Sequence, residues 1–247
     1  MRTIAYNVHG WTGYPKGTFE GKSLVEVGEL FAKSLAKYKP DIITLSEAPL
    51  CPAVDVIAQK LNMEVIAFPS SWCWPGVLLT KYEVSKVEER SLKREYWSKE
   101  LFTRHYGKAI LSTELGEVVL YSLHLYPNPK SEVHKLEVLE VVEELKVDVE
   151  EERLVLVQGD LNHEPTDPAY DEWIKARLID AFVKAGRGKG ETFKVGELTR
   201  RIDYVLVSEN LAEHLTECRV LDEPPFNVEV DEGRALSDHL PIMAIFD

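Results

Sequence analysis

The stretch VLVQGDLNHE (residues 155–164) joins an apolar run to an abrupt polar end. Its valines and leucine are typical of a buried strand, and Gly159 interrupts the run. Asp160 and Asn162 follow, two positions apart, and side chains two apart on an extended chain point to the same face. The sequence therefore predicts a buried strand that ends by presenting an acid and an amide together.

Short apolar runs of strand length recur along the whole chain. They cover residues 3–8, 41–46, 64–68, 76–80, 108–113, 118–125, 153–158, 201–207 and 241–246. Three helices are predicted between them: one after the capping-box pair Ser23 and Glu26, one beginning at Pro52, and one around residues 136–145. Because strands alternate with helices and then come in pairs joined by short turns, we expect two mixed sheets packed face to face, with helices outside.

The third predicted helix is rich in acidic residues. Its inward face is assigned to Leu136, Leu139, Val142 and Leu145. Its acids are predicted to form a solvated face and not an acidic site; they are Glu137, Glu140, Glu143 and Glu144.

Length and composition limit the classes of protein to consider. The chain has 247 residues, 45% of them hydrophobic, so residues 1–247 are expected to form a single domain around one sizeable core. The formal net charge of −13 argues against long-range attraction to duplex DNA or an anionic membrane. No apolar run approaches the roughly 20 residues of a membrane span. With no visible leader and three widely spaced cysteines, we expect a cytoplasmic protein with reduced thiols that acts as a monomer.

Polar side chains mark the ends of several predicted strands: Asn7, Glu47, His124, Asp160, Asn162, Asp238 and His239. Rigid sheets usually hold binding groups at such positions. Each residue alone has an ordinary structural explanation, such as a turn cap. Asp203 is harder to explain, because a carboxylate inside an apolar strand needs a buried partner, and His239 is the natural candidate.

These residues fall in motifs that resemble the endonuclease/exonuclease/phosphatase superfamily. The matching motifs occur in the family's order between residues 3 and 246: AYNVHG, PDIITLSE, GVLLTKYEV, SLHLYP, GDLN, RIDYVLV and SDHLPI. The resemblance implies a four-layer α/β/β/α sandwich, in which helices flank two mixed sheets. It also implies a site at one end of the two sheets.

The resemblance implies how this site would bind a metal. Glu47, with Asn7 beside it, would ligate a divalent cation, and Asp238 would complete the metal or water environment. Oxygen ligands of this kind favour Mg²⁺ or Mn²⁺ over zinc.

The remaining motif residues would act on a phosphoester substrate. Asp160 would orient or deprotonate the attacking water, and Asn162 would hold a phosphate oxygen or the nucleophile. Asp203 would fix the tautomer of His239, which would contact the phosphate and stabilise the transition state. His124 would bind the phosphate or protonate the leaving oxygen. The implied chemistry is hydrolysis by positioning and charge stabilisation.

Four further residues are expected to contact the substrate: Arg104, Lys108, Thr192 and Arg201. Two of them lie in the locally basic segment 184–201, which fits an anion-binding rim and an ordinary solvated loop equally well.

Two loops near the motifs carry aromatic residues. Trp11, Tyr14 and Phe19 follow the first strand, and Trp72 and Trp74 precede the fourth. We expect most of them to pack the bases of the loops. Stacking on nucleic-acid bases and contact with an apolar leaving group are the alternatives.

Two departures from apurinic endonucleases bear on the substrate. Those enzymes usually carry a tyrosine where this chain has His124, and a tryptophan before the RIDY motif, where this chain has Arg200. The site is more similar to those of deoxyribonucleases, tyrosyl-DNA phosphodiesterases, sphingomyelinases and phosphatases. The favoured function is a Mg²⁺-dependent phosphodiesterase or nuclease in which water attacks in line. Its substrate would be a nucleic-acid end, a short single strand or a nucleotide-like ester. A phosphomonoesterase or lipid or inositol phosphate hydrolase, and a non-catalytic binding module, are the alternatives.

Overall fold

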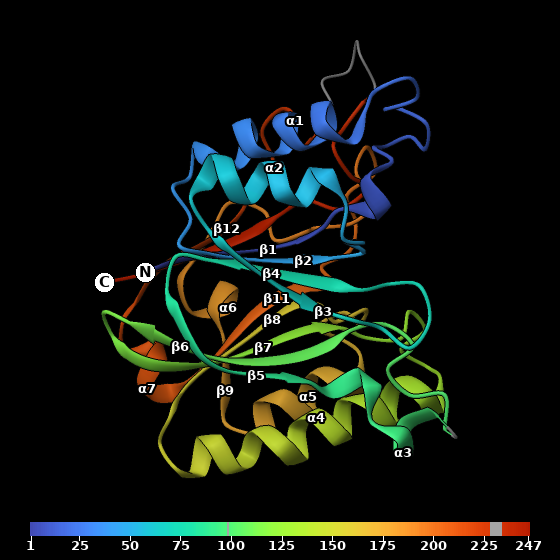
Figure 1. The fold of residues 1–247 in the computed structure, drawn as a ribbon. Coiled ribbons are helices and arrows are strands. Elements are labelled where there is room, and N and C mark those ends of the chain that lie inside the picture. The colour runs from blue at the N-terminus through green and yellow to red at the C-terminus, as the bar shows by residue number, and fades with distance from the viewer. Residues whose placement is uncertain (98, 228–233) are drawn as a thin grey trace.

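Two β-sheets lie face to face in the computed structural model, which describes residues 1–97, 99–227 and 234–247 (Figure 1). In spatial order the first sheet contains β10 (Gly186–Arg187), β12 (Leu215–Val220), β13 (Ile242–Phe246), β1 (Arg2–Asn7), β2 (Ile42–Ser46), β4 (Gly76–Thr80) and β3 (Glu64–Phe68). The second contains β5 (Glu83–Glu89), β6 (Tyr106–Thr113), β7 (Gly116–His124), β8 (Leu154–Asp160), β11 (Asp203–Ser208) and β9 (Leu178–Asp180). Both sheets are mixed, since β1 is parallel to β2 and β7 to β8, whereas β13 and β6 pair antiparallel with β1 and β7.

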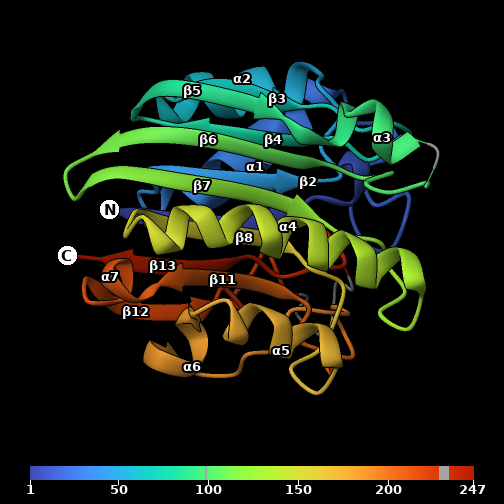
Figure 2. The ribbon, with the colours of Figure 1, turned by 90° about the horizontal axis from the view of Figure 1, so that it is seen from below.

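Helices cover the outer face of each sheet. α1 (Leu24–Ala36) and α2 (Pro52–Leu61) cover the first sheet, and α4 (Glu132–Glu150) and α5 (Pro168–Lys175) lie across the second (Figure 2). The shorter helical segments are η1 (His9–Trp11), η2 (Arg90–Leu92), α3 (Arg94–Trp97), α6 (Ala181–Ala185) and α7 (Glu209–Ala212). The predicted four-layer α/β/β/α sandwich is therefore confirmed. None of the helices in the described part of the chain has both the length and the apolar character needed to cross a membrane.

Apolar side chains fill the three spaces between the four layers. Phe31 of α1 belongs to the layer above the first sheet, Leu78 and Leu156 belong to the layer between the sheets, and Val141 of α4 packs below the second sheet. Burying one such side chain contributes roughly 1.5–3 kcal/mol. This packing gives the strand ends a rigid base.

A polar contact joins the two sheets close to the end of β8. Gln158 is fully buried; its Oε1 accepts a hydrogen bond from Thr3 (2.6 Å), and its side-chain nitrogen donates one to Thr44 Oγ1 (2.9 Å). Because a buried amide needs such partners, the three residues favour a single alignment of the sheets. That alignment is fixed two residues before Asp160.

All predicted strands are present, and Ser23 and Glu26 form the predicted capping box of α1. The sequence did not reveal β5, β9, β10 and β12. β9 and β10 are two or three residues long, and β5 is a largely exposed edge strand in which most residues are polar. β12 mixes buried and exposed positions without an apolar run.

The predicted faces of α4 are partly wrong. Leu139 is 37% exposed, whereas its neighbour Val138 is buried. Glu137, predicted to be solvated, is 1% exposed, and its carboxylate accepts hydrogen bonds from the backbone nitrogens of Phe102 (2.6 Å) and Tyr126 (2.7 Å). Two loops thus bring to this helix backbone N–H groups that need an acceptor, and Glu137 provides it. The helical periodicity of the sequence could not indicate this contact.

Candidate active site

Strand register brings three polar side chains of the second sheet together. His124, the last residue of β7, lies opposite Asp160, the last residue of β8. Asp203, the first residue of β11, lies opposite Asp160 on the other side. All three are buried. The strand ends that the sequence marked as polar therefore meet at one edge of the sandwich.

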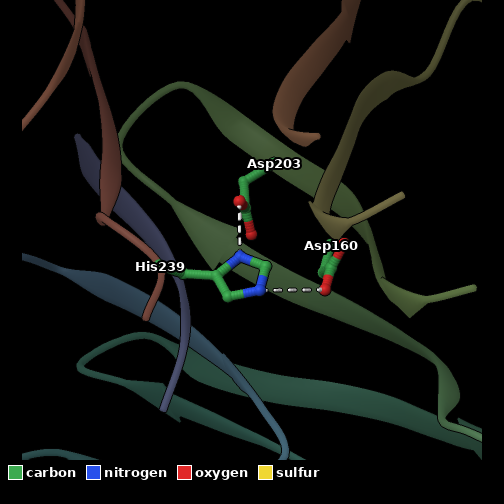
Figure 3. Close-up of side chains that lie close together, drawn as sticks. All are labelled: Asp160, Asp203 and His239. Carbon is green, nitrogen blue, oxygen red and sulfur yellow. Dashed lines mark hydrogen bonds and ion pairs between the residues drawn. The ribbon is translucent and has the colours of Figure 1, made fainter. Parts of the chain in front are cut away.

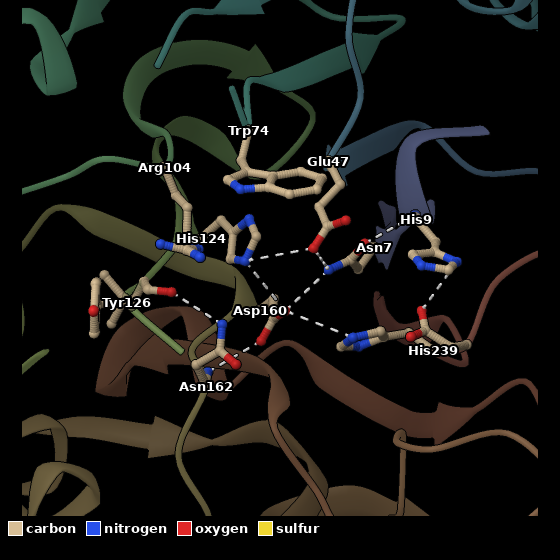
Figure 4. Close-up of polar contacts among 12 residues, drawn as sticks. Asn7, His9, Glu47, Trp74, Arg104, His124, Tyr126, Asp160, Asn162 and His239 are labelled. Atoms are coloured by element: carbon tan, nitrogen blue, oxygen red, sulfur yellow. Dashed lines mark hydrogen bonds and ion pairs between the residues drawn. The ribbon is translucent and has the colours of Figure 1, made fainter. Parts of the chain in front are cut away.

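The backbone at this edge has unusual conformations. Gly159 has φ of 141°, and a Cβ at this position would lie 1.9 Å from the carbonyl oxygen of Leu123, so β7 and β8 approach too closely for any other residue. Glu47 (φ 52°) and Asn162 (φ 53°) also have positive φ, which is uncommon outside glycine. Such conformations cluster at functional sites, and here both residues lie beside Asp160 (Figure 4).

The first sheet adds two ligand-type side chains to this edge. Asn7 ends β1, and its side-chain nitrogen donates to Glu47 Oε1 (3.2 Å) and to Asp160 Oδ2 (3.0 Å). His124 Nε2 lies 3.5 Å from Asp160 Oδ2 and 4.0 Å from Glu47 Oε1. Oxygen and nitrogen atoms from both sheets therefore surround one point (Figure 4).

Asn162 and Asp160 hold each other in place. The backbone nitrogen of Asn162 donates to Asp160 Oδ1 (3.1 Å), and its side-chain nitrogen donates to the carbonyl oxygen of Leu125 (3.0 Å). With Oδ1 occupied in this way, Asp160 Oδ2 is directed at Asn7 and His124.

Asp203 and His239 form the predicted buried pair. His239 Nδ1 lies 2.8 Å from Asp203 Oδ2, and His239 Nε2 lies 3.8 Å from Asp160 Oδ2 (Figure 3). The hydroxyl of Thr192 accepts from the backbone nitrogen of Asp203 (3.2 Å), and the hydroxyl of Ser237 accepts from that of His239 (3.2 Å). The imidazole is therefore held by one acid and faces a second.

The electrostatics of this cluster are unbalanced. Burial, followed by the charge of Asp203, raises the pKa of Asp160 to about 7, and burial also raises the pKa of Glu47. Burial opposes protonation of His239, but Asp203 and Asp160 together raise its pKa to about 10. Burial lowers the pKa of His124 well below its ordinary value, so this imidazole is neutral. Within the described part of the chain, the carboxyl groups of Glu47, Asp160 and Asp203 thus lie around one protonated imidazole, that of His239.

The donor set suits a divalent cation. Asn7 presents its amide nitrogen to two carboxylates, a position that favours positive charge; turned over, the same amide offers an oxygen ligand. Asp238 lies near enough to raise the pKa of Glu47, and its Oδ1 is 3.8 Å from His9 Nδ1. Among the described residues, ligand atoms of Asp160, Asp203 and His239 also lie within 4.8 Å of one another. Carboxylate and amide oxygens are typical Mg²⁺ or Mn²⁺ ligands.

Of the four expected substrate contacts, the structure brings only Arg104 to this edge (Figure 4). Lys108 lies 2.7 Å from Asp148 on the α4 side of the second sheet. Arg201 binds Asp180 (2.8 Å), and Thr192 is fully buried under Asp203. These three side chains have structural partners, which a count of basic residues in a segment does not reveal.

Sequence reasoning did not assign His9, Trp74 or Tyr126 to the site, yet all three lie around it (Figure 4). Tyr126 follows His124 by two residues, so the strand-end rule that selected His124 also points to it. Of the loop aromatics, Trp11 and Phe19 are buried, as predicted from packing.

The comparison with protein families agrees with this arrangement. A model described as the endonuclease/exonuclease/phosphatase family matches residues 21–239. The chain belongs to this family. Members of the endonuclease/exonuclease/phosphatase family are hydrolytic phosphoesterases and typically depend on divalent metals, which supports a phosphoesterase at that coarse level. A search of curated proteins finds no match.

Solved structures share the fold of this endonuclease/exonuclease/phosphatase family member. A mannosyl-6-phosphatase from Bacteroides thetaiotaomicron has a TM-score of 0.77 at 17% identity, covering 100% of this chain and 99% of that one. An AP endonuclease from Archaeoglobus fulgidus has a TM-score of 0.71 at 18% identity, with the same coverage. A 3′-5′ exonuclease from Neisseria meningitidis has a TM-score of 0.70 at 18% identity and covers 100% of both chains. At these identities the similarity concerns the fold alone.

Proposed function

We propose that this chain is a divalent-metal-dependent phosphodiesterase that hydrolyses a nucleic-acid end, a short single strand or a nucleotide-like ester. The observation that supports it is a buried group of three carboxyls: Asp203 and Asp160 lie next to the protonated imidazole of His239, and Glu47 is linked to Asp160 through Asn7. Buried carboxylates normally have cationic partners. A divalent metal would supply the positive charge that these carboxylates lack, and a phosphoester bound to it would be the substrate.

In this proposal Glu47 and Asn7, with Asp238 beside them, hold Mg²⁺ or Mn²⁺. When bound, the metal supplies charge stabilisation for the phosphoryl oxygens. Glu47 Oε1 lies within 4.0 Å of His124 Nε2 and 3.2 Å of the Asn7 amide, so both sheets contribute to the same point.

Asp160 is the proposed acceptor of the proton of the attacking water. A pKa of about 7 matches a base that works near neutral pH, and Oδ2 is the atom that faces the centre of the site. Asn162, hydrogen-bonded to Asp160 Oδ1, keeps this carboxylate in one orientation.

The two histidines have different proposed roles because their protonation states differ. His239, held by Asp203 and protonated at neutral pH, donates from Nε2 to a phosphate oxygen and stabilises the charge that develops there. His124 is neutral and carries one N–H, with which it binds the phosphate or the leaving oxygen.

A panel of substrates with Mg²⁺ and Mn²⁺, and with EDTA as control, tests the proposal. The panel comprises single strands, plain duplex, abasic duplex, a phosphotyrosyl end, a sugar phosphate, inositol phosphates and sphingomyelin. We expect hydrolysis of single-stranded or nucleotide-like phosphodiesters that stops with EDTA and returns with metal. Full activity in metal-free buffer, or hydrolysis of monoesters or lipids alone, contradicts the proposal.

Abasic duplex DNA is expected to be a poor substrate within this panel. The formal net charge of −13 gives little help in holding a long phosphate backbone, and Lys108 and Arg201 are bound to acids. The value of kcat/KM for abasic duplex should stay below that for single strands at near-physiological salt. A tenfold preference for abasic duplex would exclude this substrate assignment.

A further inference from the structure

A cavity of about 590 Å³ opens beside the candidate active site. Its lining includes Trp72, Trp74, Leu101, Arg104 and Tyr126. Trp74 and Arg104 also stand next to His124 and Glu47, so the cavity and the site share a wall (Figure 4). Small-molecule sites are typically concave, mostly apolar, and of this volume.

Backbone contacts fix the cavity relative to the catalytic cluster. The nitrogen of Ala48, next to Glu47, donates to the carbonyl oxygen of Pro75, next to Trp74 (2.9 Å). The nitrogen of His124 donates to the carbonyl oxygen of His105, next to Arg104 (3.0 Å). Each catalytic strand end is thus tied to one wall of the cavity. The part of a substrate attached to a phosphate at the site would therefore lie beside the cavity.

Glu137 of α4 joins the wall that carries Arg104 to the wall that carries Tyr126. Its carboxylate accepts from the backbone nitrogens of Phe102 and Tyr126, which precede Arg104 and follow His124 by two residues each. Because one buried carboxylate joins both loops, the cavity is formed before any ligand binds.

The aromatic lining includes a large side chain that is mostly exposed. Trp72 is 77% exposed at the cavity, although packing was expected for most loop aromatics, whereas Trp11 and Trp173 are buried in the cores. Exposed aromatics around a concave surface typically mark a ligand site. The flat faces of Trp74 and Tyr126 suit a planar ring.

Arg104 is a cation at the wall shared by the cavity and the site. Its guanidinium lies 5.4 Å from the centre of the Tyr126 ring and bonds Thr103 Oγ1 (3.1 Å), and in the described ranges no carboxylate forms an ion pair with it. Other arginines do form ion pairs with acids: Arg90, Arg153, Arg177, Arg187, Arg200, Arg201 and Arg219. Arg104 is therefore available to an anionic group of a ligand.

On the basis of the proposed function, we propose that this cavity binds the nucleobase adjoining the scissile phosphate, with Arg104 on a neighbouring phosphate oxygen. Stacking between aromatic side chains accepts any base. A base must be unpaired to enter such a cavity, so the substrate is the terminal or single-stranded part of a nucleic acid. A sugar phosphate would leave the apolar walls without a partner of matching chemistry.

The test compares a single-stranded tetranucleotide with the same sugar–phosphate chain lacking its bases, on the full protein with Mn²⁺. Wild type should cleave the base-bearing chain with a kcat/KM at least about tenfold higher. Trp72→Ala and Trp74→Ala should reduce this ratio, since stacking of one base contributes roughly 5- to 150-fold. Trp72→Ala is the safer variant for folding because its side chain is exposed.

Arg177→Ala is the matched control, because Arg177 binds Glu209 at an exposed position and should leave the ratio unchanged. Equal cleavage of both chains by wild type, or an unchanged ratio in both tryptophan variants, overturns the proposal. The tryptophan variants should lower kcat/KM less for a sugar phosphate or a simple aryl phosphoester than for the base-bearing chain. An equal loss for either small substrate also overturns the proposal, since the cavity would then bind a ring other than a nucleobase.

A binding measurement separates failure of this inference from failure of the proposed function. In EDTA, the base-bearing tetranucleotide should quench tryptophan fluorescence of wild type more than the baseless chain does, and Trp74→Ala should lose this difference. If no phosphoester is cut but the difference is present, the cavity assignment holds and the proposed function fails. If cleavage occurs without any difference, the cavity assignment fails alone.

Discussion

The second sheet carries two buried acidic clusters that differ in one respect. At the strand ends, Asp160 and Asp203 both lie within 4.0 Å of His239, and in the described residues neither acid forms an ion pair with a lysine or an arginine. On the outer face, below α4, Asp148 lies 2.7 Å from Lys108 and also bonds Tyr121. The outer cluster also includes Glu88, Glu144, Arg90 and Arg153, each in an ion pair.

The difference separates a structural cluster from a functional one. Where each buried acid has a cation or hydroxyl within reach, the charges stabilise the packing of α4 on the sheet and leave nothing for a ligand. Where acids outnumber cations, the folded state retains unfavourable charge that a metal and a phosphoester can offset. Changing one cluster at a time should therefore separate activity from stability.

The largest expected effect is on activity when the strand-end cluster loses its proposed base. Asp160→Asn should lower kcat by about 10²-fold or more while the fold persists, because general-base contributions are typically ~10²–10⁴-fold. Asp148→Asn is the matched variant, and it should retain kcat but lower the unfolding free energy, since Lys108 and Arg153 each lose an ion pair with this carboxylate. Similar kcat losses in both variants would remove the distinction between the clusters.

The second prediction concerns the His239–Asp203 pair. Asp203→Ala and His239→Ala should each reduce kcat/KM strongly, and the double variant should be little worse than either single one. The reason is that each change disables the same oriented imidazole, which bonds Asp203 at 2.8 Å. Kinetics of the three variants provide the cycle, and losses that multiply would show separate functions.

A third prediction addresses Glu137, which holds two cavity walls. Glu137→Ala should lower the unfolding free energy by roughly 2 kcal/mol or more, because the backbone nitrogens of Phe102 and Tyr126 both lose their acceptor. Chemical denaturation measures this loss. Glu143→Ala, whose side chain is 83% exposed on the same helix, should change stability by less than about 0.5 kcal/mol. Equal effects would mean that the buried contacts of Glu137 contribute nothing.

The smallest expected effect is on the pH dependence of stability without metal. The pKa of Asp160 is raised to about 7, so the folded state binds a proton more tightly than the unfolded state does. Stability of the metal-free protein should therefore fall as pH rises from about 4 to 7. The raised pKa of His239, about 10, acts in the same direction at higher pH.

Thermal unfolding in EDTA between pH 5 and 8 measures this slope. Asp160→Asn should have a shallower slope than wild type. If stability depends on pH equally in Asp160→Asn and in wild type, Asp160 is not the group that causes this dependence.

The sequence predicted the parts of this molecule that depend on local pattern. The β-branched runs, the Ser23–Glu26 cap and the polar strand ends, Asp160 among them, all follow from periodicity and residue chemistry, and their meeting at one edge follows from the layered fold. Glu137 and Lys108 were misassigned because their partners come from distant loops and strands. Such partners depend on tertiary packing, which a pattern along the chain does not encode.

The aromatic cavity lies beyond sequence reasoning for a related reason. Trp74 and Arg104 are 30 positions apart and become neighbours through a bridge between two loops, and the exposure of Trp72 depends on how those loops pack. Tyr126 completes the lining from a third loop.

The central claim is that surplus negative charge at the strand ends forms a divalent metal site. Calorimetric titration of metal-free protein with Mn²⁺ tests it most directly, with Glu47→Gln as the variant and Glu143→Gln as the control. We expect saturable binding to wild type and to Glu143→Gln, and binding at least about tenfold weaker to Glu47→Gln, which loses a charged oxygen ligand. Absence of binding to wild type, or equal affinity in Glu47→Gln, would show that these strand ends do not form the metal site.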